Sequence, residues 1–495
     1  MTKTLVITPP FLESFRPPIS GAIICAVAKS AGHDVTAWDP NIKLFNKVGG
    51  DKFYEMMLQF NGLQDIDSED NKVVHEFLAN YDYNGYDYIL ISVFSQYEIA
   101  GTKIVLEEIK RRGITSTIVL GGSGVELNYN LETDVKFGES MLKQGLCNYY
   151  VVGEGEVALT EIFKGNASYP GINGKAPSQI DNLDTLPFPN YDFYDRNEYD
   201  YIDPDMPDLF VYGSRGCVRR CTFCDVAHYW PLYRYRSGAN IAEELLGYWE
   251  KYGIKHFFFT DSLVNGSLKA YRELHETLAR KQGLPKLHIS GYAIIRPKNQ
   301  HPKELFDMMQ NTGKHLWSIG VEHGSDAMRL DMKKKFTNED IEWHLEQSER
   351  IGLQNNWLLM PTWVNEKLEH HQEYLDMFVR WRRYVANGVI TSITIAPALA
   401  ALKNTPIVDD HHADLRFYET ENNVLREMLW MNDSNPELTI KERHRRTLEI
   451  YKQALRYKWP VNEAQRKLLA FESIVNSSVK LTSTGHLNTI TKSGV

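Results

Sequence analysis

The chain has 495 residues and a mass of 57.1 kDa, which is enough for roughly two to four domains. Its 43% hydrophobic and 24% charged residues are typical of folded proteins and exclude generic disorder. The net charge of −9 argues against a broad nucleic-acid-binding surface, and no apolar run is long enough to predict a membrane span. Only five cysteines occur, which excludes a secreted disulfide framework and favours a cytoplasmic protein.

Residues 1–165 alternate short apolar runs with helical patterns. Helices are expected over 19–31 and 100–112. Strands are expected over 5–7, 35–38, 88–93, 117–120 and 149–152. Apolar strands separated by helices predict a Rossmann-like, doubly wound parallel sheet, in which ligands bind beyond the carboxyl ends of the strands.

Small or flexible residues follow four of these strands and would meet at that edge of the sheet. Ordinary turn chemistry explains any one such loop, but four together favour a ligand site. The candidate ligand-binding residues are Pro9, Pro10, Ser92, Ser95, Gly121, Gly122, Gly153, Glu154 and Gly155.

Residues 166–208 have the composition of a linker, and a second alternation of strands and helices fills residues 209–407. Helices are expected over 239–252, 268–282, 302–313 and 338–352. Strands are expected over 209–212, 256–260, 288–292, 317–321, 356–360 and 390–395. This succession predicts a full or partial (β/α) TIM-type barrel, whose chemistry belongs at the carboxyl ends of its strands.

Residues 408–495 are expected to form a helical region and a loose tail, with the basic cluster 441–446 on a solvated helix face.

Three of the five cysteines lie together, directly after the first expected barrel strand. Cys217, Cys221 and Cys224 have the spacing C-x3-C-x2-C. Thiolates bind soft metals and iron–sulfur clusters, and three ligands for four irons leave one iron open to a substrate. His228 offers an alternative, since with the three cysteines it could complete a Cys3His zinc site. We expect the remaining Cys25 and Cys147 to be buried packing residues.

The motif C-x3-C-x-aromatic-C, with Phe223 as the aromatic residue, resembles that of the radical S-adenosylmethionine (SAM, AdoMet) enzymes. The segments ITPPF at 7–11, YDYILISVFS at 86–95 and IVLGGSG at 118–124 resemble the cobalamin (B12)-binding-type domain that precedes such barrels. Within the barrel, IGVEHGSD at 319–326 and the lysines at 333–335 resemble later segments of the family. The resemblance spans roughly residues 1–410.

The resemblance implies a role for each matching residue. The three cysteines would hold a [4Fe–4S] cluster whose open iron binds AdoMet. Asp261 would meet the AdoMet ammonium, Arg296 its carboxylate and Glu322 its ribose hydroxyls. Phe223 would lie near the adenine, and Ser325 is a further candidate contact. Apart from the cysteines, each could equally be an ordinary polar or packing residue at the rim of a barrel.

The resemblance also implies cobalamin in the N-terminal domain. The chain has no Asp-x-His-x-x-Gly motif there, so either cobalt would lack a histidine ligand from the protein, or the domain keeps the fold without the cofactor.

The leading expectation is a cobalamin-dependent enzyme that methylates an unactivated carbon of a small-molecule or peptide substrate. The external electron donor would be a protein such as flavodoxin or ferredoxin. The alternatives are cyclisation or rearrangement, with or without cobalamin. Methylthiotransferases are disfavoured, because they need a second three-cysteine cluster and only two further cysteines exist.

Overall fold

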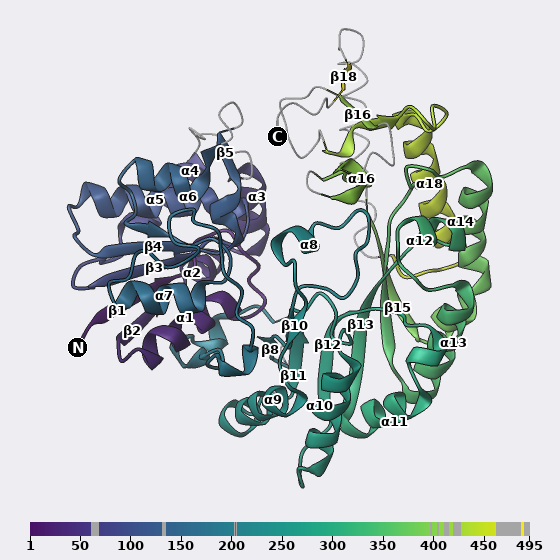
Figure 1. Cartoon of the computed structure of the whole chain (residues 1–495), viewed down its shortest axis with the longest axis horizontal. Helices are drawn as coiled ribbons and strands as arrows, with labels where there is room; N and C mark the ends of the chain where they lie inside the picture. Colours follow the sequence, from purple (N-terminus) through teal and green to yellow (C-terminus); the bar gives the residue numbers. More distant parts are fainter. Residues whose placement is uncertain are drawn as a thin grey trace. The chain divides into compact units, whose positions relative to one another are not determined.

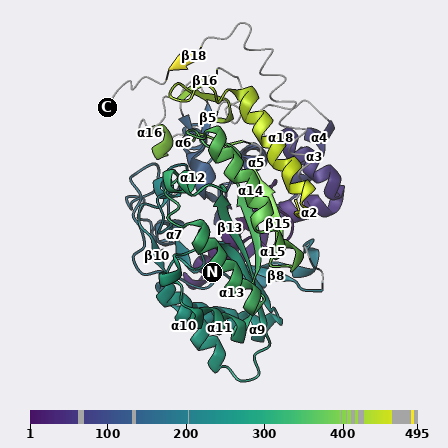
Figure 2. The ribbon, with the colours of Figure 1, turned by 90° about the vertical axis from the view of Figure 1, so that its right-hand side faces the viewer.

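The computed structural model describes residues 1–60, 69–130, 135–201, 203, 205–396, 398–402, 405–409, 415–418, 427–461 and 487–489. The chain divides into two compact units (Figures 1 and 2). One unit contains Met1–Val211 and Gly247–Ile254, and the other contains Tyr212–Leu246 and Lys255–Val495. Within the described residues, no helix combines the length and apolar character that crossing a membrane requires.

The first unit is built on a five-stranded parallel sheet in the order β2-β1-β3-β4-β7. This confirms the predicted Rossmann-like sheet. Register pairs Ile7 with Ile91 and Ser92 with Gly121, so the carboxyl ends of β1, β3 and β4 share one edge. The strands are β1 (Lys3–Ile7), β2 (Asp34–Trp38), β3 (Tyr88–Ser92), β4 (Thr117–Gly121) and β7 (Tyr149–Tyr150).

Helices separate these strands, and the sequence patterns found only two of them. The helices are α1 (Ile19–Ser30), α2 (Pro40–Val48), α3 (Gly50–Phe60), α4 (Glu69–Ala79), α5 (Tyr97–Arg111), α6 (Phe137–Lys143) and α7 (Gly155–Phe163). Helix α2 has a clear local cause that was missed: Asp39 caps it by accepting a hydrogen bond from the Ile42 backbone N–H, and Pro40 occupies its first turn. Residues 166–208 contain short 3-10 turns and pack within this unit, where Asn190 N–H donates to Ala22 O.

The second large sheet has six strands in the order β15-β14-β13-β12-β11-β8. The pairs from β11 to β15 are parallel, so the barrel expectation resolves to a partial barrel. Its strands are β8 (Asp208–Val211), β11 (His256–Phe259), β12 (Leu287–Ala293), β13 (Gly313–Glu322), β14 (Gln354–Leu359) and β15 (Ile390–Ile395). The helices between them are α9 (Gly238–Tyr252), α10 (Leu268–Arg280), α11 (Lys303–Thr312), α12 (Asp326–Asp331), α13 (Asn338–Ile351), α14 (Leu368–Arg380) and α15 (Arg382–Ala386).

The core of this partial barrel is aromatic, with Trp317, Trp357 and Trp381 fully buried among aliphatic side chains. Burying so much apolar area fixes the positions of the strand ends, where the candidate residues lie.

The C-terminal region contains the expected helix, α18 (Ile440–Arg456), but also short strands that were not predicted. These are β16 (Leu415–Tyr418), β17 (Trp430–Asn432) and β18 (Leu487–Thr489), and they form an antiparallel sheet. The expectation of a solvated basic face over 441–446 is wrong for two arginines. Arg443 and Arg446 are both buried; Arg443 donates to the carbonyl oxygens of Met428 and Trp430.

Candidate functional site

The three clustered cysteines lie on one loop, between β9 (Ser214–Arg215) and α8 (Val226–Tyr229). All three are half-buried free thiols. Burial raises the pKa of each, that of Cys224 to about 11. Thr222, inside the loop, donates its backbone N–H to Met332 O and accepts from the backbone N–H of Ile407. The loop is therefore anchored by segments far away in the sequence.

Lys334 provides a buried positive charge beside these thiols. Its Nζ lies 2.9 Å from Glu322 Oε1 and 5.8 Å from the centre of the Phe223 ring. Burial disfavours the ammonium, but Glu322 and Cys221 outweigh it and hold the pKa of Lys334 above its usual value. Gly320 makes room for the pair, since a Cβ there would lie 2.2 Å from Glu322 Oε1 and 2.9 Å from Lys334 Nζ.

Asp261 follows β11, as predicted, and is buried. Both of its carboxylate oxygens accept hydrogen bonds within the protein: Oδ2 from the Gly213 N–H at 2.8 Å and Oδ1 from the Ser214 hydroxyl. Burial raises its pKa to about 6. Asp261 therefore holds the segment that leads into the cysteine loop.

Arg296 follows β12 and is half-buried, and it forms no ion pair with a carboxylate of the described residues. Its guanidinium donates to the backbone oxygens of Asn265 and Gly266. Burial is the main cause that lowers its pKa, and the nearby positive charge of Arg219 adds to this. These two cations make the space between them favourable for an anionic group.

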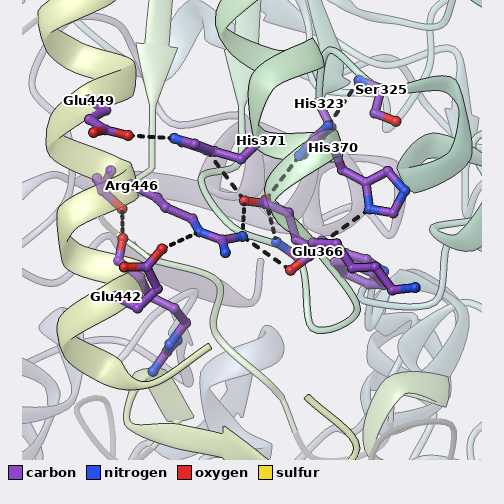
Figure 3. A network of polar contacts seen from close by, with 12 residues as sticks. His323, Ser325, Glu366, His370, His371, Glu442, Arg446 and Glu449 are labelled. Atoms are coloured by element: carbon purple, nitrogen blue, oxygen red, sulfur yellow. Dashed lines mark hydrogen bonds and ion pairs between the residues drawn. The ribbon is translucent and has the colours of Figure 1, made fainter. Parts of the chain in front are cut away.

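Ser325 follows β13 and is fully buried. Its backbone N–H donates to His323 Nδ1, while its hydroxyl has no hydrogen-bond partner among the residues that the structure describes. Because Nδ1 accepts, the His323 proton lies on Nε2, which donates to Glu366 Oε2 at 3.0 Å. Figure 3 shows that Glu366 is the centre of this network, which also includes Arg446 from α18.

The predicted residues of the first unit lie at the carboxyl edge of its sheet. Pro9, Pro10 and Ser92 are buried, Ser95 and Gly121 are half-buried, and Gly122 is exposed. Gly122 adopts a φ of 90°, and a Cβ on it would lie 2.3 Å from Val93 O. The structure therefore packs the loop after β4 directly against the loop after β3.

The remaining predicted residues of this edge come before and within the first turn of α7. Gly153 has a φ of 78°, and Gly155 is the first residue of the helix. Glu154 is buried and its Oε2 accepts from the Ile180 N–H at 2.5 Å. The side chain of Glu154 is thus occupied by the 166–208 segment.

Sequence reasoning missed Glu98, which orders the loop after β3. It is buried, and its Oε2 accepts from the backbone N–H groups of Phe94 and Ser95, each at 2.8 Å. Burial raises the pKa of Glu98 to about 8. The signal that could have found it is an acidic residue in the first turn of a helix that follows a buried strand. Glu366 and Arg446 were missed because their pairing joins residues 80 positions apart.

The other cysteines and His228 occupy different environments. Cys25 and Cys147 are buried, which confirms their predicted packing role, and burial raises the pKa of each to about 12. His228 lies in α8, where its ring packs edge-on against Tyr229.

Part of the chain matches a known protein family. Residues 211–378 match the model of the radical SAM superfamily. This match supports the iron–sulfur interpretation of the cysteines over the zinc alternative.

Two curated proteins are similar over part of the chain. Cytidylyl-2-hydroxyethylphosphonate methyltransferase of Streptomyces wedmorensis is 28% identical over 198 residues, which is 38% of this chain and 36% of that protein. Anaerobic magnesium-protoporphyrin IX monomethyl ester cyclase of a Synechocystis species is 20% identical over 279 residues, 53% of this chain and 54% of that protein. The chain thus spans between about a third and about half the length of these relatives.

Two solved structures share the fold over nearly the whole chain. The methyltransferase TsrM of Kitasatospora setae, solved with tryptophan and a SAM analogue, aligns with 97% of this chain and 100% of its own, at a TM-score of 0.64 and 14% identity. OxsB, a cobalamin-dependent radical enzyme solved with aqua-cobalamin, aligns with 98% of this chain and 75% of its own, at a TM-score of 0.63 and 16% identity. The likeness extends through both units.

Proposed function

We propose that this chain is a radical SAM enzyme with an N-terminal domain of the cobalamin-binding type, and that it methylates an unactivated carbon in a cobalamin-dependent reaction. The observation that carries the proposal is the placement of three half-buried thiols on one loop, beside the buried ammonium of Lys334. Sulfur ligands and a nearby cation suit an anionic iron–sulfur cluster.

Cys217, Cys221 and Cys224 would hold a [4Fe–4S] cluster. With AdoMet bound, such a cluster supplies the electron that cleaves the sulfonium and yields a 5′-deoxyadenosyl radical. The electron would come from an external protein donor such as flavodoxin or ferredoxin.

The strand-end residues would bind and orient AdoMet. Arg296 donates to backbone oxygens but pairs with no carboxylate in the described part of the chain, so it is suited to the AdoMet carboxylate, and Glu322 is suited to the ribose hydroxyls. The buried hydroxyl of Ser325, which meets no hydrogen-bond partner within the described ranges, is available for a polar contact. Phe223, which packs at 75° against Trp363, would lie near the adenine. Asp261 has both oxygens occupied, so we assign it to shaping the cysteine loop as well as to the AdoMet ammonium.

The first unit would bind cobalamin at the carboxyl edge of its sheet, through the loops after β1, β3, β4 and β7. The close packing of Gly122 against Val93 and the anchoring of the Phe94–Ser95 loop by Glu98 support an ordered ligand-binding edge. Cobalamin, when bound there, supplies the methyl group for transfer. The substrate would be a small molecule or peptide.

A second candidate function is a radical cyclisation or rearrangement, with or without cobalamin. The observation that favours it is the similarity to the magnesium-protoporphyrin cyclase, which extends over more of this chain than that to the phosphonate methyltransferase. Both functions would share the same cluster and AdoMet site, and they differ in the fate of the substrate radical and in the need for cobalamin.

Anaerobic reconstitution with iron and sulfide tests the proposal. The wild-type chain should bind about four irons and, with AdoMet and a reductant, release 5′-deoxyadenosine. Cys221→Ala should lose both properties, whereas Cys147→Ala, a matched removal of a buried thiol outside the loop, should keep them. Deoxyadenosine formation by Cys221→Ala would refute the assignment.

Binding of cobalamin needs a separate measurement. The reconstituted chain is incubated with hydroxocobalamin and passed through a gel-filtration column, and the absorbance of the protein fraction is recorded. Co-elution supports the cobalamin-dependent function. Complete separation of cobalamin from the protein would contradict the cobalamin-dependent function and favour radical chemistry without cobalamin.

A further inference from the structure

We propose that Lys334 sets the reduction potential of the cluster, by fixing one buried positive charge beside the three cysteines and against Glu322. This inference rests on the proposed function, since it requires the cluster. It concerns a residue whose side chain is not itself a metal ligand.

The backbone around Lys334 is shaped to point this one lysine inward. Lys333 and Lys335 both have left-handed backbone angles, with φ of 58° and 60°, and both side chains are exposed, whereas Lys334 between them is buried. The Lys334 N–H donates to Arg329 O. Three consecutive lysines therefore have different environments, and only the central one approaches the cysteine loop.

The turn that carries Lys334 is attached to the cysteine loop itself. Thr222 N–H donates to Met332 O at 3.2 Å, and the Thr222 hydroxyl donates to Asp331 O at 3.4 Å. Since Thr222 follows Cys221 directly, the position of the ammonium is coupled to that of the thiols. The ammonium also lies 5.8 Å from the centre of the ring of Phe223, which precedes Cys224.

The charged side chains on the cysteine loop itself are less buried than Lys334. Arg219 and Asp225 are half-buried, and Arg220 is exposed. Solvent screens such charges more strongly than it screens a buried one. The buried pair of Lys334 and Glu322 is therefore screened less than the charged side chains that lie on the cysteine loop itself.

Reduction of the cluster adds one electron from the external donor and makes the cluster more negative. A buried cation stabilises this reduced form and raises the potential, whereas a neighbouring carboxylate lowers it. Removing the charge of Lys334 should thus lower the potential, and removing the charge of Glu322 should raise it. A purely structural role of the pair does not produce these opposite shifts.

The experiment is a redox titration of the reconstituted chain without AdoMet, with the reduced cluster measured by electron paramagnetic resonance. In Lys334→Met we expect the ratio of reduced to oxidised cluster at a fixed potential to fall about tenfold, a shift of about 59 mV for a one-electron couple. Lys334→Arg should restore the ratio to near wild type. Glu322→Gln should raise it.

Lys335→Met is the matched control, because it removes the same charge from an exposed neighbouring position. Its potential should equal that of the wild type. The inference is overturned if Lys334→Met keeps about four irons per chain and its potential moves no more than that of Lys335→Met. If Lys334→Met fails to hold the cluster, Glu322→Gln decides: an unchanged or lowered potential refutes the inference. A wild-type chain without any cluster would instead refute the proposed function.

Discussion

Arg446 Nη1 lies 2.9 Å from Glu366 Oε1, and both side chains are almost completely buried. This ion pair joins the C-terminal helix α18 to the segment after β14 of the partial barrel (Figure 3). The other oxygen of Glu366 accepts from His323, which in turn accepts from the Ser325 N–H. A contact made by the C-terminal helix therefore supports the strand end that carries Glu322 and Ser325.

Replacing Arg446 by Met should destabilise the chain strongly, because it leaves Glu366 buried without its guanidinium partner. We expect a loss of about 3–5 kcal/mol in the free energy of unfolding. Arg445→Met is the control, since this arginine is 47% exposed and its loss should cost no more than about 0.5 kcal/mol. Thermal unfolding of the apo chain measures both. Equal melting temperatures for the two variants would contradict the assigned role of the pair.

Glu98 should make the stability of the chain decrease as pH rises. Its pKa is about 8 in the folded chain and 4.5 in the reference state. Between these values the unfolded chain has lost the proton that the folded chain keeps, so each rise in pH favours unfolding. Glu98→Gln should flatten this dependence, while Glu107→Gln, at an exposed position of the same helix, should not. Urea unfolding at pH 5, 6, 7 and 8 tests this; parallel curves for wild type and Glu98→Gln would show the idea to be wrong.

Gly320→Ala should disrupt the Lys334–Glu322 pair, since its Cβ would fall within 2.2 Å of the Glu322 carboxylate. We expect at least a tenfold loss in deoxyadenosine formation, because a misplaced group near the reacting centre is costly. Gly247→Ala in α9 is the control: its Cβ meets no atom of the described residues within 4 Å, and the substitution should stabilise the helix slightly. The initial rate of AdoMet cleavage is the measurement. A wild-type rate in Gly320→Ala would contradict the prediction and show that the Lys334–Glu322 pair tolerates displacement.

Asp261→Ala separates two roles of this carboxylate. If it shapes the loop through Gly213 and Ser214, the reconstituted variant should bind markedly fewer irons than the wild type. If it acts only on the AdoMet ammonium, the iron content should stay unchanged while the KM for AdoMet rises. We expect the loss of iron, because burial and two internal hydrogen bonds tie Asp261 to the segment before Cys217. Iron analysis and AdoMet kinetics on the same preparation distinguish these outcomes.

The sequence by itself determined the fold class and the cysteine motif. The periodicity that indicates strands and helices depends only on neighbouring residues. The three cysteines lie on one short loop, so their spacing can be recognised without knowledge of long-range contacts. The positions of Asp261, Arg296 and Glu322 at the ends of their strands were also predicted, because the carboxyl ends of parallel strands share one edge; their roles towards AdoMet stay predictions.

Only the tertiary structure decided which charges are buried and with whom they pair. Arg446 looked like part of a solvated basic face, yet it meets Glu366 80 residues away in the chain. Lys334 is the middle one of three adjacent lysines. Its two neighbours, Lys333 and Lys335, have left-handed backbone angles, and Lys334 alone of the three is buried. Burial and pairing depend on segments that are distant in sequence, whereas local patterns report only what neighbouring residues share.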